Sequence, residues 1–561
     1  MPYLAPAALA ASLSAAGHEP DIADAALDYV HHLLLPETIN SFAVAIDHSD
    51  RLRAVIARGR PERISGLLAR AARLARAAPA ALDVLQRADL FRHSELRAMA
   101  WHTLLAVHQL AGQAHSPSQL APDTFSSSYH LLRPTDVIAL ADDSRVNPFR
   151  TYLRDIAAPK ILAEHPDTIA ISVAGPSQLA AAVTLARLIR SKVSGLPILA
   201  GGAFLTAIAS DLERHPLLVS QFDAIFTGEG ERTLAEWCGR WPRLRPDGIR
   251  GAIYSRDGRI VSVPPEVASS ANVWPTPDFS TVSLSSYLSP APVFPLLTQR
   301  GCYYRRCAFC SGTLVHDGRF RERPAELVVN DLLQLSARQG CRYISITDQA
   351  VTPRMLALLA KELANHSHLN LRWFAQVRIE PALTSDLLQR IYRAGCRLLV
   401  FGIESANDRV RTLMDKGGSF QLVRRIIDDC ARVGIAVHLF LIAGFPGETE
   451  DEARGSVTEI CGLATAPGST AFIHPFVVER GSRVFAAPDR YGVRLVSPAP
   501  DSIPYQFDYE VRAGITPERV QHILPELATE LSRRFPGPTP SLAHSLLSIA
   551  HEDAGDLRGV C

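Results

Sequence analysis

Three of the nine cysteines in the chain lie within nine residues, at Cys302, Cys307 and Cys310. They follow the apolar run 293–297, which predicts a short buried strand that ends in a loop. Three close thiolates suit a 4Fe–4S cluster, because such clusters are held by cysteine and an iron without a protein ligand can bind a substrate. The pattern therefore predicts a metal or cluster loop with these three cysteines as its ligands.

Two other interpretations of this loop remain open. A structural zinc site is closed and tetrahedral and needs a fourth protein ligand. The sequence contains no second C-x-x-C or H-x-x-H pair to supply one. Three unrelated core cysteines are the other alternative, although their density in one loop argues against it.

The run 298–312 resembles the cluster loop of radical SAM enzymes. In that family three cysteines bind a 4Fe–4S cluster, and S-adenosylmethionine (SAM) chelates the fourth iron through its amino and carboxylate groups. An aromatic residue before the last cysteine packs near the adenine, and Phe309 stands at that position. The commonest family spacing has three residues between the first two cysteines, whereas Cys302 and Cys307 enclose four. The extra residue changes the path of the loop but not the number of ligands.

The composition describes a globular protein of more than one domain. A chain of 561 residues exceeds what one hydrophobic core supports, so two or three domains are expected. The net charge of +1 gives no basic field, and no run of apolar residues is long enough to span a bilayer, so we expect neither nucleic acid nor membrane as a partner. The few cysteines predict no disulfide framework, which makes a reducing cytoplasm the expected location.

The first 240 residues predict a doubly wound, Rossmann-like α/β domain. We expect a helix over 6–16 and a strand over 19–25, the second half of a βαβ unit whose first strand is missing from the chain. A helical insertion is expected at about 30–165. Strands over 168–173, 197–200 and 224–227 then alternate with helices, and glycines follow them.

The order of these glycine turns resembles the cobalamin-binding domain of cobalamin-dependent radical SAM enzymes. The resemblance implies that the turns embrace the corrin and its nucleotide tail. No D-x-H-x-x-G motif is present to supply a lower histidine ligand. A degenerate Rossmann-like domain without a cofactor is the alternative. The cobalamin-binding positions implied are Ser172, Ser177, Gln178, Gly201, Gly202, Gly228 and Glu229.

Residues 241–290 are rich in proline and are expected to be a linker. Residues 291–485 predict a partial (βα)6 barrel, because strand and helix patterns alternate at about thirty-residue intervals. The expected strands are 294–297, 342–347, 371–377, 398–403, 436–442 and 471–478. The expected helices are 324–339, 353–365, 385–394, 420–433 and 450–463.

In such barrels the chemistry lies at the carboxyl ends of the strands. The radical SAM resemblance places groups that hold SAM there. Any one of these residues, taken alone, is equally compatible with a salt bridge or a helix cap. The SAM-binding positions implied, besides Phe309, are Asp348, Gln376, Arg378, Glu404, Ser405, Gly444 and Glu448. We interpret His438 and His474, which lie within expected strands, as core residues.

Residues 486–561 predict a small helical C-terminal region, with helices over 516–535 and 541–551 that cap the barrel mouth. The chain ends at Cys561, for which the sequence indicates no role.

Together the resemblances imply a cobalamin-dependent radical SAM enzyme. The cluster would reduce SAM to give a deoxyadenosyl radical, and methylcobalamin would methylate an unactivated carbon of a natural-product or peptide substrate. An electron donor such as flavodoxin or ferredoxin would be its partner. A non-methylating rearrangement or cyclisation is one alternative. A cobalamin or redox sensor without turnover is another.

Overall fold

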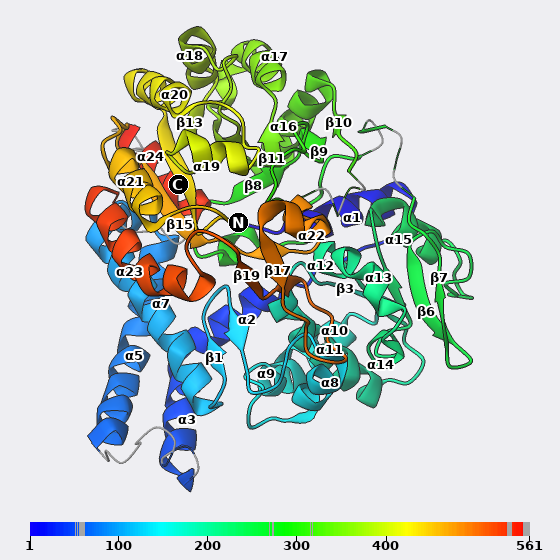
Figure 1. The fold of residues 1–561 in the computed structure, drawn as a ribbon. Coiled ribbons are helices and arrows are strands. Elements are labelled where there is room, and N and C mark those ends of the chain that lie inside the picture. The colour runs from blue at the N-terminus through cyan, green and yellow to red at the C-terminus, as the bar shows by residue number, and fades with distance from the viewer. Residues whose placement is uncertain are drawn as a thin grey trace.

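The computed structural model describes residues 1–50, 52, 54, 62–266, 268, 270–271, 274–312, 314, 316, 318–535 and 541–553. Two sheets organise the chain, one of five strands in the N-terminal half and one of six strands in the C-terminal half. Figure 1 shows the six-stranded barrel above the five-stranded sheet, with a pair of helices projecting to one side. No helix among the described residues is long and apolar enough to cross a bilayer.

The N-terminal sheet has the order β3-β4-β5-β6-β7. Strands β3 (Ile169–Ser172), β4 (Ile198–Gly201) and β5 (Ala224–Phe226) are parallel and short. Helices α11 (Pro176–Lys192) and α15 (Gly230–Cys238) follow β3 and β5. These three strands confirm the doubly wound pattern, because strands buried on both faces read as continuous apolar runs.

Residues 252–262 differ from the linker expected there. They form the antiparallel strands β6 (Ala252–Arg256) and β7 (Arg259–Ser262), which extend the N-terminal sheet beyond β5. The two residues between them are Asp257 and Gly258, both with positive φ. An Asp-Gly pair between alternating residues is a strong hairpin signal, so the sequence carried the information.

The strand expected over 19–25 is absent. Helix α1 (Leu4–Ala15) packs against α15, residues 18–24 have no regular secondary structure, and α2 spans Ala25–Leu34. The side chain of Asp24 accepts a hydrogen bond from the backbone N–H of Leu27 and so caps α2. The expectation of half a βαβ unit is therefore wrong.

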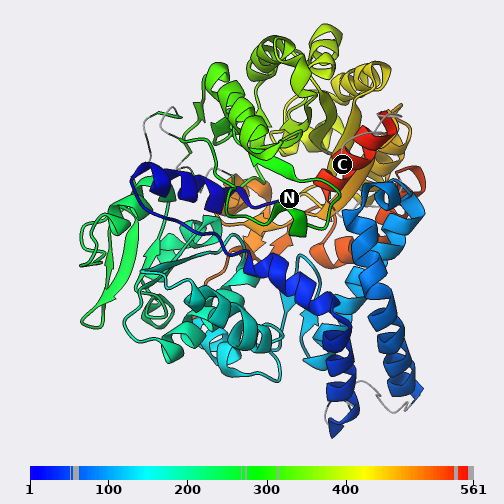
Figure 2. The same ribbon diagram turned by 180° about the vertical axis from the view of Figure 1, so that it is seen from behind.

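Most of the described residues between 25 and 163 are helical, as in the insertion expected at about 30–165. Its longer members are α3 (Pro36–Asp47), α5 (Glu62–Gln86), α7 (Ser94–Ala114) and α8 (Pro134–Asp142). Helices α3, α5 and α7 pack on one another, and α3 and α5 extend away from both sheets in the two views (Figures 1 and 2).

The C-terminal sheet is an open parallel barrel with the order β15-β14-β13-β12-β11-β8. All six expected strands and all five expected helices are confirmed. The strands are β8 (Val293–Leu296), β11 (Tyr343–Val351), β12 (Arg372–Val377), β13 (Cys396–Glu404), β14 (Ala436–Ala443) and β15 (Thr470–Pro475). The helices are α16 (Ala325–Gln339), α17 (Pro353–Ala364), α18 (Ser385–Arg393), α20 (Phe420–Val433) and α21 (Glu450–Cys461), and α23 (Pro517–Arg534) packs beside β15 as the sixth.

Alternation along each strand separates two cores. On β13, Leu399, Phe401 and Ile403 face the surrounding helices and belong to the large outer core. Leu398 and Val400 face the barrel interior and belong to a smaller cluster. This period of two sets which side chains of each strand line the interior.

The C-terminal region is not purely helical. Strand β16 (Val478–Glu479) pairs with β18 (Gln506–Phe507), and β17 (Val493–Leu495) pairs with β19 (Tyr509–Val511). Helix α24 (Leu542–Asp553) does not cap the mouth. Its Leu546 and Leu547 pack against Val293 and Ala436, the first residues of β8 and β14, so α24 fills the amino-terminal end of the barrel. Cys561 lies outside the described residues.

Candidate functional site

The three cysteines lie at the tip of a hairpin at the carboxyl edge of the barrel. Strand β9 (Gln299–Arg300) precedes the cysteine loop and pairs with β10 (Arg321–Glu322), which follows it. Gly301 has φ +80, and a Cβ there would lie 2.1 Å from the carbonyl oxygen of Arg319. Only glycine satisfies both conditions, so this position fixes where the chain enters the cysteine loop.

Asp348 holds the start of this loop. Its buried carboxylate accepts hydrogen bonds from the backbone N–H groups of Thr298 at 3.0 Å and Gln299 at 3.2 Å, and from the Thr298 hydroxyl. Burial raises the pKa of Asp348 to about 7, against these hydrogen bonds. The resemblance implied that Asp348 binds SAM, and in the structure its oxygens hold the start of the cysteine loop.

Donors reach two of the cysteine sulfurs. Arg378 Nη1 donates to Cys307 Sγ at 3.5 Å, and the backbone N–H of Gly312 donates to Cys310 Sγ at 3.3 Å. Burial raises the pKa of the Cys310 thiol, and the nearby Cys307 and Cys302 raise it further. Three thiols close enough to repel one another as thiolates suit a positively charged metal centre.

The described residues contain no group of three His, Cys, Asp or Glu side chains gathered to hold one metal ion. A single zinc ion would need the sulfurs to converge on one point. A 4Fe–4S cluster instead binds each thiolate at a separate iron. Cys302, Cys307 and Cys310 would supply the three thiolates that such a cluster needs.

Arg378 and two tyrosines fix the loop against β12. The guanidinium of Arg378 lies 3.3 Å from the ring centroid of Tyr304 and donates to the carbonyl oxygen of Lys416 at 2.7 Å. The Tyr303 hydroxyl donates to Glu380 at 2.7 Å. Both tyrosines adjacent to Cys302 therefore serve to hold the loop in place.

Glu404 ends β13 and forms a buried ion pair that the sequence did not reveal. Lys416 Nζ lies 2.8 Å from Glu404 Oε1, and both side chains are at most one-tenth exposed. Lys416 also lies 5.6 Å from the ring centroid of Phe309. A Cβ at Gly402 would fall 2.2 Å from the Glu404 carboxylate, so any other residue there would force this side chain to shift.

A hydrogen bond joins the first and last residues of the Gly444 to Glu448 turn. The backbone N–H of Gly444 donates to Glu448 Oε2 at 2.6 Å, while the buried Oε1 has no hydrogen-bond partner in the described residues. Burial raises the pKa of Glu448 to about 7. Ser405 is buried and shares a hydrogen bond with Ser456 at 2.9 Å, which makes it a support for the end of β13.

Gln376, by contrast, is exposed on the interior face of β12, on the same side as Arg378. Gln349 donates to the Gly312 carbonyl oxygen at 2.8 Å, and its own Oε1 is buried without a partner in the described residues. The amides of Gln376 and Gln349 lie at the barrel mouth beside the cysteine loop, where they are placed to hydrogen-bond to a polar ligand.

The glycine turns of the N-terminal domain lie at the carboxyl edge of its sheet. Ser172 ends β3, Gly201 ends β4, and Gly228 follows β5. Gly202 has φ +116, and a Cβ there would meet the Val173 carbonyl oxygen at 2.5 Å. The edge is lined by small residues that remain partly exposed, Ser177 among them. Ligands of doubly wound domains bind at this edge of the sheet.

Gln178 and Glu229 are engaged by the protein itself. Gln178 Oε1 accepts from the backbone N–H groups of Ala174 at 2.6 Å and Gly175 at 3.3 Å, so it caps α11. Glu229 accepts from Arg321 at 3.0 Å and lies 3.4 Å from Arg300. Burial opposes its ionisation, but His316, Arg321 and Arg300 outweigh burial and hold the pKa of Glu229 well below its ordinary value.

This ion-pair cluster joins the two halves of the molecule. Arg300 and Arg321 belong to the hairpin that carries the cysteines, and Arg300 also pairs with Glu231 at the start of α15. The Trp274 ring lies 4.1 Å from the Arg300 guanidinium and 5.3 Å from that of Arg321. The carboxyl edges of the two sheets are therefore held face to face.

A second bridge comes from residues 476–511. Arg480 pairs with Asp211 of the N-terminal domain at 2.6 Å. Tyr505 lies 3.4 Å from the Ser311 hydroxyl and 6.0 Å, ring to ring, from Phe204 just after Gly202. Figure 1 shows α22 (Arg483–Ala486) and β17 between the two sheets. This segment connects the cysteine loop with the glycine turns.

Residues 296–460 match the radical SAM superfamily. The chain contains a radical SAM domain. Among curated proteins, the chain is 26% identical over 296 residues to an uncharacterized methyltransferase of Pyrococcus horikoshii, covering 52% of this chain and 63% of that one. It is 25% identical over 272 residues to the bacteriochlorophyllide d C-12(1)-methyltransferase of Chlorobaculum tepidum, covering 46% and 54%. The chain thus spans about three-fifths and about half of their lengths.

Solved structures share the two-part fold around the radical SAM domain. TsrM from Kitasatospora setae, with its tryptophan substrate and a SAM analog, has a TM-score of 0.54 at 17% identity, over 72% of this chain and 88% of TsrM. The cobalamin-dependent enzyme OxsB, with aqua-cobalamin and SAM, has a TM-score of 0.54 at 16% identity, over 74% and 68%. At these identities the likeness establishes the fold.

Proposed function

We propose that the protein is a cobalamin-dependent radical SAM enzyme that methylates an unactivated carbon. The observation that carries the proposal is the placement of Cys302, Cys307 and Cys310. They lie on a hairpin whose Arg300 and Arg321 anchor it to the carboxyl edge of the N-terminal sheet. A cluster in the loop and a cobalamin on that edge would face each other across the barrel mouth.

The cluster would be held by the three cysteines, with Arg378 and the Gly312 N–H donating to their sulfurs. SAM would lie beside it, against Phe309, Gln376 and the Glu404–Lys416 pair, while Ser405, Gly444 and Glu448 shape the turns behind them. When bound, the cluster supplies one electron to cleave SAM, and cobalamin carries the methyl group.

Cobalamin would rest on the edge formed by Ser172, Ser177, Gly201, Gly202 and Gly228. TsrM and OxsB share this fold, and both have been solved with cobalamin bound, which supports the assignment. We assign Gln178 and Glu229 positioning roles, because helix α11 and the arginine pair already occupy their oxygens.

Methyl transfer is favoured because both curated relatives are named methyltransferases. The tryptophan bound to TsrM is a small-molecule substrate, and we propose a natural-product or peptide substrate for this chain. We further propose a flavodoxin or ferredoxin as electron donor and the cytoplasm as its location. The alternatives are a non-methylating rearrangement or cyclisation and a sensor without turnover.

The test is anaerobic reconstitution with iron, sulfide and cobalamin, followed by SAM and a reductant. Bound cobalamin, deoxyadenosine and S-adenosylhomocysteine are then quantified together. Cobalamin retention with both nucleosides supports the methyltransferase. Deoxyadenosine with retained cobalamin but no S-adenosylhomocysteine supports the non-methylating alternative. An intact cluster without either nucleoside supports the sensor.

A further inference from the structure

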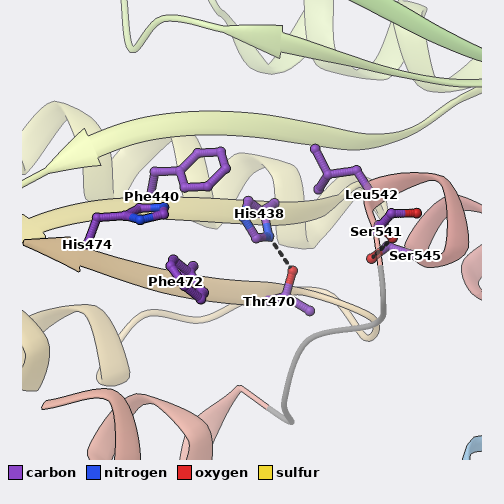
Figure 3. A pocket seen from close by; sticks show the side chains of 8 residues that line it. All are labelled: His438, Phe440, Thr470, Phe472, His474, Ser541, Leu542 and Ser545. Carbon is purple, nitrogen blue, oxygen red and sulfur yellow. Dashed lines mark hydrogen bonds between the residues drawn. The ribbon is translucent and has the colours of Figure 1, made fainter. Parts of the chain in front are cut away.

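A cavity of about 230 Å³ lies inside the barrel, between the interior faces of β14 and β15 and the start of α24. Figure 3 shows the side chains that line it, with His474 toward the carboxyl ends of the strands and Leu542 at the other end. Phe472 is 42% exposed although its strand faces the interior at this point, which shows that the space is hollow. None of the residues that line it was assigned to cluster, SAM or cobalamin above.

The walls consist mainly of rings. Phe440 packs edge-on to His438 at 4.4 Å between centroids, and His474 lies 4.3 Å from Phe472 and 5.8 Å from Phe440. Among the described residues that line the cavity, none is a carboxylate, lysine or arginine. Rings arranged in this way favour contact with another flat ring, by stacking or by edge-to-face packing.

The two histidines contribute ring nitrogens to the cavity, beside the hydroxyl groups of Thr470, Ser541 and Ser545. His438 Nδ1 is hydrogen-bonded to Thr470 Oγ1 at 2.6 Å, which orients the ring and leaves Nε2 without a partner among the described residues. His474 makes no hydrogen bond to any residue in the described part of the chain, although its ring contacts are as above. Each imidazole therefore has a nitrogen available to a ligand.

Both imidazoles are held neutral. Burial, and to a smaller extent the neighbouring His474, lower the pKa of His438 to about 4. Burial also lowers the pKa of His474, against the charge of Glu404. Neutral imidazoles in an apolar cavity favour an uncharged ligand, because an ionised one would lose its hydration without a partner of opposite charge.

At the carboxyl ends of the strands, the cavity extends to the level of the Glu404–Lys416 pair. In the sheet Glu404 pairs with Leu441, and the next residue of β14, Ile442, pairs with His474. His474 is thus within one residue of the level of the Glu404–Lys416 pair. Ser541 and the first turn of α24 line the opposite end of the cavity.

Size limits what the cavity holds. An apolar cavity of about 150 Å³ accommodates benzene, so about 230 Å³ admits a ring system of one or two fused rings. Pockets for whole drug-sized ligands range over about 300–1,000 Å³. Only part of a larger substrate would fit here.

We infer that this cavity binds a flat, uncharged aromatic ring of the substrate, with His438 and His474 hydrogen-bonding to polar atoms on its edge. The inference rests on the proposed function for the identity of the ligand as a substrate. It adds the chemical class of the group that the barrel receives, and it gives two residues interpreted as core a role in specificity.

Binding of indole to the anaerobically reconstituted protein tests the inference, measured by ligand-observed NMR titration. Cyclohexanol and benzoate are the matched probes, one without an aromatic ring and one charged. Indole should bind saturably and the two others more weakly. His474→Leu and Phe472→Leu should each lower the affinity for indole about fivefold, which corresponds to the loss of one hydrogen bond or one ring contact. His368→Gln, a histidine in the loop before β12, is the control.

The inference is overturned if indole binds no better than cyclohexanol, if neither cavity variant differs from His368→Gln, or if saturating SAM displaces indole. Deoxyadenosine formation, measured on the same preparations, reports on the proposed function separately. Indole binding that depends on Phe472 and His474 in a protein that does not cleave SAM would leave the cavity assigned and the proposed function wrong. SAM cleavage without indole binding would support the proposed function and show that the cavity assignment is wrong.

Discussion

Arg321 of strand β10 pairs with Glu229 of the N-terminal domain, 92 residues away in the sequence, and both side chains are less than one-tenth exposed. Arg321 follows the cysteine loop directly on its hairpin. The pair therefore sets the distance between the cysteines and the glycine turns, and with it the alignment of the two proposed cofactors.

Glu229→Gln should destabilise the protein by about 3 kcal/mol, because it leaves two buried arginines short of one compensating charge. Thermal unfolding of the variant and the wild type measures the effect. The control is Glu266→Gln, which removes the partner of Arg232 in an ion pair whose side chains are more than half exposed. That change should cost less than about 1 kcal/mol. Equal losses in the two variants would contradict a structural role for the Glu229 cluster.

Alanine at Cys302, Cys307 or Cys310 should abolish cluster assembly and deoxyadenosine formation, because each thiolate binds its own iron. Iron and sulfide per chain and deoxyadenosine are measured after anaerobic reconstitution. Cys461→Ala on α21 is the control, since this cysteine lies outside the loop, and it should keep wild-type iron. Full SAM cleavage in any one of the three loop variants would show that the ligand set is wrong.

Lys416→Met should weaken SAM binding about tenfold or more without reducing iron content, because it leaves Glu404 buried and unpaired beside the proposed SAM site. Equilibrium binding of SAM to the reconstituted protein gives the value. Lys361→Met in the last turn of α17 matches the chemistry of the substitution and should leave the affinity unchanged. An unchanged SAM affinity in Lys416→Met would remove this pair from the site.

Stability should depend on pH through Glu448. Its pKa is about 7 in the folded protein and 4.5 as an ordinary value, so the folded state retains a proton that the unfolded state releases. The resulting stabilisation is complete below about pH 4.5 and is lost as pH rises through about 7. The free energy of unfolding of Glu448→Gln, relative to that of the wild type, should therefore rise by on the order of 2 kcal/mol from pH 5 to pH 8. Melting temperatures are measured at a series of pH values. If those of the two proteins change with pH in the same way, the raised pKa of Glu448 is refuted.

The sequence predicted the barrel because each of its elements carries a local signal. Buried strands such as 398–403 are continuous apolar runs, and Thr384, Ser419 and Thr449 cap the helices that follow the strands. The N-terminal sheet was predicted less completely. The β6–β7 hairpin was missed although Asp257-Gly258 marks its turn, and the strand at 19–25 was expected from topology where only a helix cap exists.

Contacts between distant residues could not be predicted in the same way. The Glu229–Arg321 and Glu404–Lys416 pairs carry no pattern in the sequence, because nothing local distinguishes an arginine that will be buried from one on the surface. Asp348 was expected after the second barrel strand, but its bonds to Thr298 and Gln299 depend on how β8 and β11 are aligned. His438 and His474 were interpreted as core residues, and only the open inner face of β15 shows that they line a cavity.

The central claim is a cluster with an iron open to SAM, held by three cysteines at the barrel mouth. The most direct test is electron paramagnetic resonance of the reduced, reconstituted protein before and after addition of SAM. The account predicts a one-electron-reduced 4Fe–4S signal that changes when SAM ligates the open iron, followed by deoxyadenosine. A fully assembled cluster whose signal is unaffected by SAM, with no deoxyadenosine formed, would contradict it.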